Sequence, residues 1–304
     1  MLNRILKKEP QWTILEVLKW TTEYFSVNGI DSPRLTAEIL LAEVLGIERI
    51  GLYVRFDQPL SEDERTRFKA LVKRRLLREP VAYILGRKDF WKIELDLTPD
   101  VLIPRPETEI LVERAIEAVD EMMSENRKTP FRAIDMGTGS GAIAISLAHC
   151  RPGLLYYASD LSYAALRVAV HNAALNKVKD RISFFASNWF ESIARSCSFD
   201  MILSNPPYIS SAEVTKLAPE ILNHEPLMAL DGDVDGLRDI FRLIEEAPAF
   251  LAPGGFLMME IGCDQKAAVE QKVEKQPEYA EVSFRKDYGG HHRVAVIKKN
   301  DLSH

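Results

Sequence analysis

Apolar and polar positions divide this chain into two parts with different periodicities. Within residues 1–80, apolar side chains recur at the three- and four-residue intervals of amphipathic helices, for example in segments 13–18 and 35–42. Ser32 followed by Pro33 is typical of a helix start, with a capping hydroxyl and a proline in the first turn. We therefore predict that residues 1–80 form an N-terminal helical domain.

The next segment reads as a linker. Residues 82–95 place Gly86 between aromatic and β-branched stretches, a pattern that predicts a β-hairpin with a glycine-centred turn. Three prolines, Pro99, Pro104 and Pro106, then interrupt the chain and indicate an extended loop. We assign residues 81–106 to this hairpin and proline-rich linker.

From about residue 107 to residue 304, helical patterns alternate with short apolar runs. This alternation predicts an α/β domain with a mostly parallel sheet covered on both faces. The predicted strands are residues 131–136, 154–159, 182–186, 199–204, 254–260, 279–285 and 292–298. The long interval 206–253 ends in a predicted helix at 237–251 and is typical of a lid or substrate loop.

The overall composition is that of an ordinary soluble protein. A chain of 304 residues with 46% hydrophobic and 28% charged residues can bury the cores of two domains. No apolar run approaches the roughly 20 residues of a membrane helix, and Met1 to Arg4 begin no signal peptide. We expect a cytoplasmic monomer without a membrane partner. The three cysteines and six histidines show no metal-ligand spacing, so we also expect a metal-free site.

The charge pattern bears on possible partners. A formal net charge of −6 argues against a protein that coats long stretches of nucleic acid. Seven basic residues nevertheless fall between Arg65 and Arg78. Such a run is more often a solvated helix face, and the alternative is a surface that docks a protein partner.

A glycine-rich loop follows the first predicted strand of the α/β domain. Gly137, Thr138, Gly139, Ser140 and Gly141 precede an apolar helix at 143–148, an arrangement that brings backbone close to a ligand. Asp160 lies 19 residues beyond Gly141, at the end of the next strand, where a carboxylate accepts hydrogen bonds from ribose hydroxyls. These residues predict an adenosine cofactor, with NAD and S-adenosylmethionine both open at this point because the loop also matches the dinucleotide fingerprint.

Two further residues, one before the glycine loop and one after the third strand, each have two possible interpretations. Asp135 either faces the amino group of the ligand or accepts hydrogen bonds from N–H groups of the loop itself. Trp189 follows the third strand, where its ring either flanks an adenine or packs at the rim of the core.

The segment Asn205, Pro206, Pro207 and Tyr208 decides between the two cofactors. It ends a buried strand, and its two prolines rigidify a turn that presents carbonyl acceptors. The Asn205 amide oxygen adds an acceptor and the Tyr208 ring adds a flat face, which together suit a planar amino group. A methyltransferase needs such a pocket and a hydride-transfer enzyme does not, so we predict S-adenosylmethionine. The alternative is that these residues form only a turn.

Several motifs together resemble one family, the release-factor glutamine methyltransferases of the PrmC/HemK type. The motifs that carry the resemblance are REPVAYILG at 78–86, LIPRPETE at 102–109, the glycine loop, SNPPYI at 204–209, EP at 225–226, AL at 229–230 and KDYGG at 286–290. The resemblance implies a seven-stranded methyltransferase domain with one antiparallel strand, preceded by a helical domain and a hairpin. It also implies methylation of N5 of the glutamine in the Gly-Gly-Gln motif of class I peptide chain release factors.

Carried over position by position, the resemblance assigns roles to individual residues. The cofactor contacts would be Gly137 to Gly141, Asp160, Trp189 and Asn205, and residues 205–208 would hold the substrate glutamine. Asn205, Pro206 and Tyr208 would act in catalysis. Arg105, Glu107 and Glu109 would lie at the substrate entrance, or equally would form ordinary salt bridges.

Two positions depart from the family pattern. Asn188 stands where an acidic residue is common, and His291 with His292 replaces the usual Asn-Asp pair. Two other functions remain open from the sequence: an adenine-N6 methyltransferase, and a non-catalytic module that binds a cofactor or partner. The acidic charge disfavours DNA, and we expect no stable nucleic-acid binding, although a small RNA offers the same amino group to the same pocket.

Overall fold

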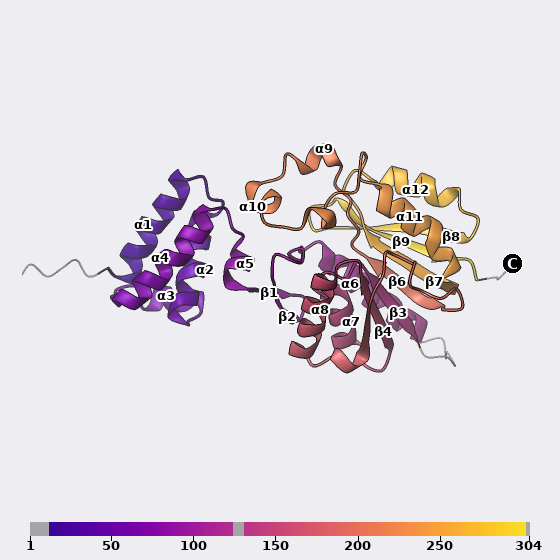
Figure 1. The fold of residues 1–304 in the computed structure, drawn as a ribbon, viewed down its shortest axis with the longest axis horizontal. Coiled ribbons are helices and arrows are strands. Elements are labelled where there is room, and N and C mark those ends of the chain that lie inside the picture. Colours follow the sequence, from indigo (N-terminus) through magenta and orange to yellow (C-terminus); the bar gives the residue numbers. More distant parts are fainter. Residues whose placement is uncertain (1–11, 124–130, 302–304) are drawn as a thin grey trace, which may run out of the picture. The chain divides into compact units, whose positions relative to one another are not determined.

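The computed structural model describes residues 12–123 and 131–301, which form two compact units (Figure 1). Unit 1 comprises the described part of Met1–Gly86 together with Pro219–His224. Unit 2 comprises the described parts of Arg87–Ala218 and Glu225–His304. A short piece of the long segment that follows Asn205 therefore belongs to the N-terminal unit.

Unit 1 is helical, as its apolar periodicity predicts. Its helices are α1 (Ile14–Val27), α2 (Pro33–Leu45), α3 (Arg49–Val54), α4 (Glu62–Leu76), α5 (Val81–Leu85) and α10 (Pro219–Leu222). Their apolar faces bury a core that includes Phe25, Leu40 and Leu41. Helix α2 begins as predicted, with Ser32 at the N-cap and Pro33 in the first turn, but the Ser32 backbone is left-handed (φ 46°) and its hydroxyl makes no capping hydrogen bond.

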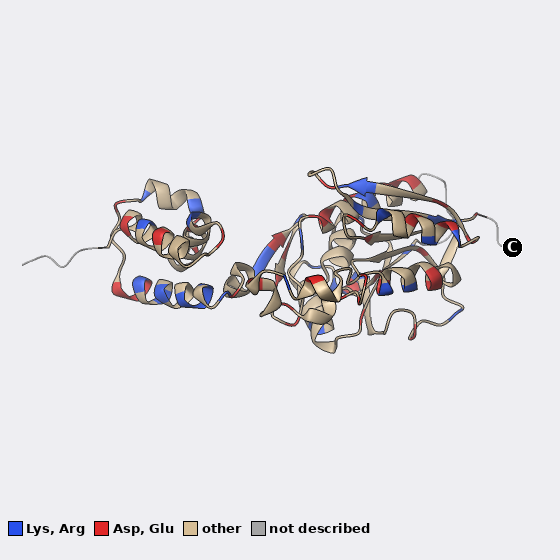
Figure 2. Ribbon diagram, turned by 90° about the horizontal axis from the view of Figure 1, so that it is seen from above, with Lys and Arg blue, Asp and Glu red and all other residues tan. Residues whose placement is uncertain are grey.

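The basic run between Arg65 and Arg78 lies on α4 and just after it. Arg75 is buried and pairs with Glu220 at 2.9 Å, and Arg78 donates to the backbone oxygens of Asn28 and Gly29. Arg74 pairs with Glu79 at 2.5 Å. Part of this run is therefore engaged in holding unit 1 together. Figure 2 shows that residues of both charge signs are spread over both units.

Unit 2 begins with a β-hairpin. Strands β1 (Arg87–Phe90) and β2 (Ile93–Asp96) pair in antiparallel fashion. The hairpin was predicted, but the glycine-centred turn is wrong: Gly86 ends helix α5, and Trp91 lies in the turn with φ 52°. Apolar residues before Gly86 are buried on a short helix, which the same residue pattern did not distinguish from a strand.

The main sheet of unit 2 contains seven strands among the described residues, in the order β5-β4-β3-β6-β7-β9-β8. The strands are β3 (Arg132–Met136), β4 (Leu155–Asp160), β5 (Ile182–Ala186), β6 (Phe199–Ser204), β7 (Leu251–Glu260), β8 (Tyr279–Lys286) and β9 (His292–Lys299). Strand β9 runs antiparallel to both neighbours, and the other pairs are parallel. The predicted α/β fold and its single antiparallel strand are confirmed.

Helices cover both faces of this sheet (Figure 1). They are α6 (Thr108–Met123), α7 (Ala142–Cys150), α8 (Tyr163–Leu175), α11 (Arg238–Glu246) and α12 (Lys266–Glu274), while the short α9 (Ser211–Val214) lies in the segment between β6 and β7. The first three pack on one face, and α11 and α12 pack on the other. Helix α11 is shorter than predicted, because a 3-10 turn at Ala247–Ala249 precedes β7.

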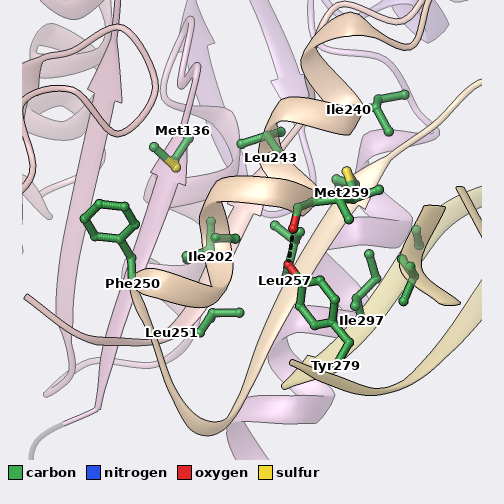
Figure 3. Packing of buried hydrophobic residues seen from close by; sticks show 14 of the residues in the cluster. Met136, Ile202, Ile240, Leu243, Phe250, Leu251, Leu257, Met259, Tyr279 and Ile297 are labelled. Atoms are coloured by element: carbon green, nitrogen blue, oxygen red, sulfur yellow. Dashed lines mark hydrogen bonds between the residues drawn. The ribbon is translucent and has the colours of Figure 1, made fainter. Parts of the chain in front are cut away.

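The core under α11 and α12 is aligned across the sheet (Figure 3). Ile134, Ile202, Leu257 and Ile297 are register partners on four adjacent strands, and all are fully buried. The Tyr279 hydroxyl donates to the backbone oxygen of Ile244 at 2.8 Å, so this polar group is satisfied inside the core. This packing fixes the strand ends on which the site is built.

Candidate active site

The polar residues of interest lie at one edge of the main sheet. The glycine loop follows β3, Asp160 ends β4, Asn205 follows β6 and Glu260 ends β7. Because these four strands are parallel, their carboxyl ends meet at the same edge, where α/β folds bind ligands.

A cavity of about 540 Å³ opens at this edge, within unit 2. Its volume is typical of a site for a small molecule or cofactor. The predicted site residues that line it are Gly137, Thr138, Gly139, Ser140, Asp160, Trp189, Asn205 and Pro207. Gly141, Pro206 and Tyr208 lie next to lining residues in the chain but do not line the cavity themselves.

The glycine loop has a backbone that side chains would disturb. Gly137, Gly139 and Gly141 all have positive φ, at 72°, 55° and 86°. A Cβ on Gly141 would lie 2.6 Å from Cδ1 of Ile145, whereas a Cβ on Gly139 would meet no heavy atom within 4 Å. Gly141 is therefore needed for packing of the loop on α7, and Gly139 leaves backbone open at the cavity wall.

Asp160 holds this loop from the neighbouring strand. Its carboxylate accepts the backbone N–H of Gly139 and that of Ser162, each at 2.8 Å. Burial raises the pKa of Asp160, and the hydrogen bonds from backbone N–H groups oppose that rise. The carboxylate thus lies at the cavity wall and is hydrogen-bonded to the loop there.

Asp135 lies behind the loop and does not line the cavity. One carboxylate oxygen accepts from the Thr138 hydroxyl at 2.6 Å and from the N–H of Ala144 at 3.2 Å. Burial raises the pKa of Asp135 to about 7. Of the two interpretations of Asp135, the geometry favours the one in which it accepts hydrogen bonds from its own loop.

Trp189 is anchored in the cavity lining beside the glycine loop. Its indole N–H donates to Asp239 of α11 at 3.0 Å, and its backbone is left-handed with φ 52°. A Cβ on Gly137 would approach the indole ring to 3.7 Å. The ring is therefore held against the glycine loop, and it lines the cavity besides packing against the core.

The residues after β6 are held by a polar network. The Asn205 amide nitrogen donates to the Thr108 hydroxyl at 3.2 Å, and this hydroxyl donates to Glu260 at 2.6 Å. The Tyr208 hydroxyl donates to the other oxygen of Glu260 at 2.9 Å. The carbonyl oxygen of Tyr208 accepts from the Gln265 side chain at 2.9 Å. Both ends of Tyr208 are thus fixed by unit 2.

Two of the three charged candidates in the motif at 102–109, Arg105 and Glu109, have structural partners. Arg105 pairs with the buried Glu225 at 2.7 Å, and the N–H of Trp91 donates to Glu109 at 3.0 Å. Asn188 accepts a hydrogen bond from Arg242 at 3.2 Å, so a guanidinium lies next to the position at which the family pattern has an acid. His292 begins β9, and the next residue of that strand, Arg293, pairs with Asp287 of the preceding turn at 3.1 Å.

Sequence reasoning missed Glu260, Thr108 and Asp239. Glu260 directly follows the buried run 257–259, and a charge at the end of a buried parallel strand was a usable signal. Thr108 belongs to the LIPRPETE motif, but nothing in the sequence connected it with Asn205. Among residues 12–123 and 131–301, no group of histidine, cysteine or acidic side chains could hold a metal ion. Within the same residues, no helix is both long and apolar enough to span a membrane.

Two family models match parts of this chain. Residues 117–232 match the Methyltransferase small domain, and residues 16–86 match the PrmC N-terminal domain. The N-terminal domain of human METTL16 in complex with SAH has a similar fold, with a TM-score of 0.51 at 20% identity, covering 78% of this chain and 84% of that one. The family model over residues 117–232 and the fold together indicate a methyltransferase.

Relatives that align over most of the chain identify the family within the methyltransferases. The release factor glutamine methyltransferase of Rhodopirellula baltica is 38% identical over 288 residues, which cover 95% of this chain and 97% of the relative. The corresponding protein of Geobacter sulfurreducens is 42% identical over 266 residues, covering 86% and 89%. This chain belongs to the release factor glutamine methyltransferase family, as the sequence motifs predict.

Proposed function

We propose that this protein methylates the side-chain amide nitrogen of the glutamine in the Gly-Gly-Gln motif of class I peptide chain release factors, with S-adenosylmethionine as methyl donor. The observation that carries this proposal is that Asn205 and the glycine loop line the same cavity. A residue that can accept N–H bonds from an amide therefore lies beside the backbone that would hold a nucleotide-like cofactor.

The cavity residues fit such a cofactor. The open backbone at Gly139 and the carboxylate of Asp160 suit a ribose, and the Trp189 ring suits the face of an adenine. S-adenosylmethionine, when bound, supplies an electrophilic methyl group on a positively charged sulfur. The residues that would hold it are Gly137 to Gly141, Asp160, Trp189 and Asn205.

The protein's own contribution is to position a poor nucleophile. The lone pair of a glutamine amide nitrogen is delocalised, so catalysis depends on fixing its orientation. In the proposed mechanism, the Asn205 side-chain oxygen and the Pro206 carbonyl oxygen each accept a hydrogen bond from one N–H of the substrate amide. The Tyr208 ring packs on the face of that amide. Positive charge that develops on the nitrogen strengthens both hydrogen bonds in the transition state.

The test is transfer of labelled methyl from S-adenosylmethionine. Acceptors would be a class I release factor, the same factor with Gly-Gly-Ala in place of Gly-Gly-Gln, and a mixture of adenine-containing RNA and DNA. We expect label only on the intact factor, and loss of that label with Asn205→Ala. Label on the Gly-Gly-Ala factor would refute the proposed position, and label on nucleic acid alone would establish adenine methylation instead.

A further inference from the structure

The side-chain amide of Asn205 can adopt two orientations. In one the NH₂ group faces Thr108 and the oxygen faces away from it, and in the other the two groups exchange places. A substrate amide offers N–H donors, so only the orientation that presents the Asn205 oxygen to it is productive. The two ends of an asparagine amide are nearly equal in shape, and hydrogen-bond partners decide between them. The structure contains a set of partners that makes this decision.

The first partner is Thr108, the first residue of α6. Its side chain is almost completely buried, and its hydroxyl carries one proton and two lone pairs. The hydroxyl oxygen lies 2.6 Å from Glu260 and 3.2 Å from the Asn205 nitrogen. If the single proton goes to Glu260, only lone pairs remain, so Thr108 must accept from the Asn205 NH₂ group.

The second partner is Glu260, which is fully buried at the end of β7. One oxygen takes the Thr108 proton and the other takes the Tyr208 proton at 2.9 Å. A carboxylate can only accept, so it draws both hydroxyl protons toward itself. Burial raises the pKa of Glu260, and the hydrogen bonds from Thr108 and Tyr208 oppose that rise because they stabilise the carboxylate.

We propose that Thr108 and Glu260 are positioning residues that fix the Asn205 amide with its oxygen available to the substrate nitrogen. This proposal rests on the proposed function, because it takes an amide N–H as the group to be received. Proton donation runs from Asn205 to Thr108 and from Thr108 to Glu260. Thr108 therefore connects the motif at 102–109 to the one at 204–209.

Glu260→Gln tests the direction of the relay. A glutamine at this position can donate to Thr108, which frees the Thr108 proton for the Asn205 oxygen and allows the amide to turn around. Thr108→Val removes both hydrogen bonds at similar volume, and Thr108→Ser restores the hydroxyl. Thr21→Val is the matched control, because Thr21 is a fully buried threonine of unit 1 whose hydroxyl has no hydrogen-bond partner.

The first readout is kinetic. We expect Glu260→Gln and Thr108→Val to lower kcat for release-factor methylation by about tenfold or more, the scale for losing one oriented hydrogen bond. The dissociation constant of S-adenosylhomocysteine should change by less than about threefold, because loop and Asp160 contacts remain. Thr108→Ser should recover most of kcat. Equal kcat for the valine and serine variants at position 108 would overturn the proposal.

The second readout needs no substrate. In protein labelled with ¹⁵N at asparagine, the Asn205 side-chain NH₂ signal, identified by its loss in Asn205→Asp, should exchange slowly in the wild type and faster in Thr108→Val. If this difference appears but the wild type labels no release factor, the positioning holds and the proposed function fails. If the factor is labelled but the signal is unchanged by Thr108→Val, the function holds and the positioning fails.

Discussion

The backbone N–H of Gly139 donates a 2.8 Å hydrogen bond to the carboxylate of Asp160, across the ends of two neighbouring strands. The same carboxylate accepts from Ser162 at 2.8 Å. The loop and the acid are therefore held together by the protein's own hydrogen bonds, and such preorganisation lowers the cost of binding.

Asp160→Asn should weaken cofactor binding. An asparagine offers one acceptor oxygen where the aspartate offers two, so either Gly139 or Ser162 loses its partner, and the negative charge beside the predicted ribose is gone. We expect the dissociation constant of S-adenosylhomocysteine, measured by calorimetry, to rise about tenfold to a hundredfold. Asp57→Asn, at an exposed site of unit 1, is the control. Affinity within twofold of the wild type for Asp160→Asn would contradict this role.

Asp135 should make stability depend on pH. Burial raises the pKa of its carboxyl from an ordinary 3.8 to about 7. Between these values the folded state binds more protons than the unfolded state, so the free energy of unfolding falls as pH rises through this window and levels off above it. The loss is on the order of a few kcal/mol.

Asp135→Asn isolates that contribution. The asparagine side chain does not ionise, so the free energy of unfolding should fall less between about pH 4 and pH 7 than it does in the wild type. Urea denaturation across this window measures the difference. Parallel stability curves for the two proteins would show that Asp135 titrates at its ordinary pKa.

Arg105→Ala should destabilise unit 2. The side chain of Glu225 is only 1% exposed, and it accepts from Arg105 at 2.7 Å and from the N–H of Ile103 at 3.2 Å. Removing the arginine leaves a buried carboxylate without its counter-ion, which costs about 3–5 kcal/mol for a fully buried pair and less here because Arg105 is 28% exposed. In Arg105→Ala/Glu225→Gln, which lacks the buried charge, we expect part of this loss to be recovered. A double variant no more stable than the single one in urea denaturation would argue against this mechanism.

Gly236→Ala should lower activity through Tyr208. Gly236 has φ 74°, and a Cβ there would lie 2.3 Å from the Tyr208 carbonyl oxygen, so one of the two segments must shift. We expect kcat to fall by tenfold or more, since displacement of about 1 Å near a reacting group has such effects.

Gly46→Ala is the control for Gly236→Ala. It introduces the same left-handed strain at φ 62° with no atom within 4 Å, at a cost of about 1 kcal/mol. It should therefore lower stability in urea denaturation without lowering kcat. An equal loss of kcat in both variants would show that backbone strain, and not the contact with Tyr208, is responsible.

The sequence was a good guide to the sheet and a poorer one to the network around Asn205. A central strand such as β6 is buried along its whole length, which makes its apolar run easy to see, whereas the edge strand β8 is mostly exposed. The segment before Gly86 was misread because five apolar residues fit a short helix as well as a strand.

The sequence predicts those residues of the candidate site that belong to contiguous motifs. Residues 137–140, Asp160, Trp189 and Asn205 line one cavity, because parallel strands bring successive loops to one edge. Thr108 and Glu260 are 97 and 55 residues from Asn205, and their meeting depends on the packing of α6 against the sheet. No periodicity in a single sequence encodes that packing.

The assignment of residues 219–224 to the N-terminal unit affects how the chain can be divided. The chain passes between the units after Gly86, after Ala218 and after His224, so one proteolytic cut at residue 86 leaves the piece 219–224 attached to the larger fragment. A truncated protein that starts at Arg87 would expose that piece without Arg75, the buried partner of its Glu220. Residues 1–86 therefore cannot be deleted without removing the structural partners of residues 219–224. We expect a protein that lacks residues 1–86 to be sensitive to proteases at 219–224.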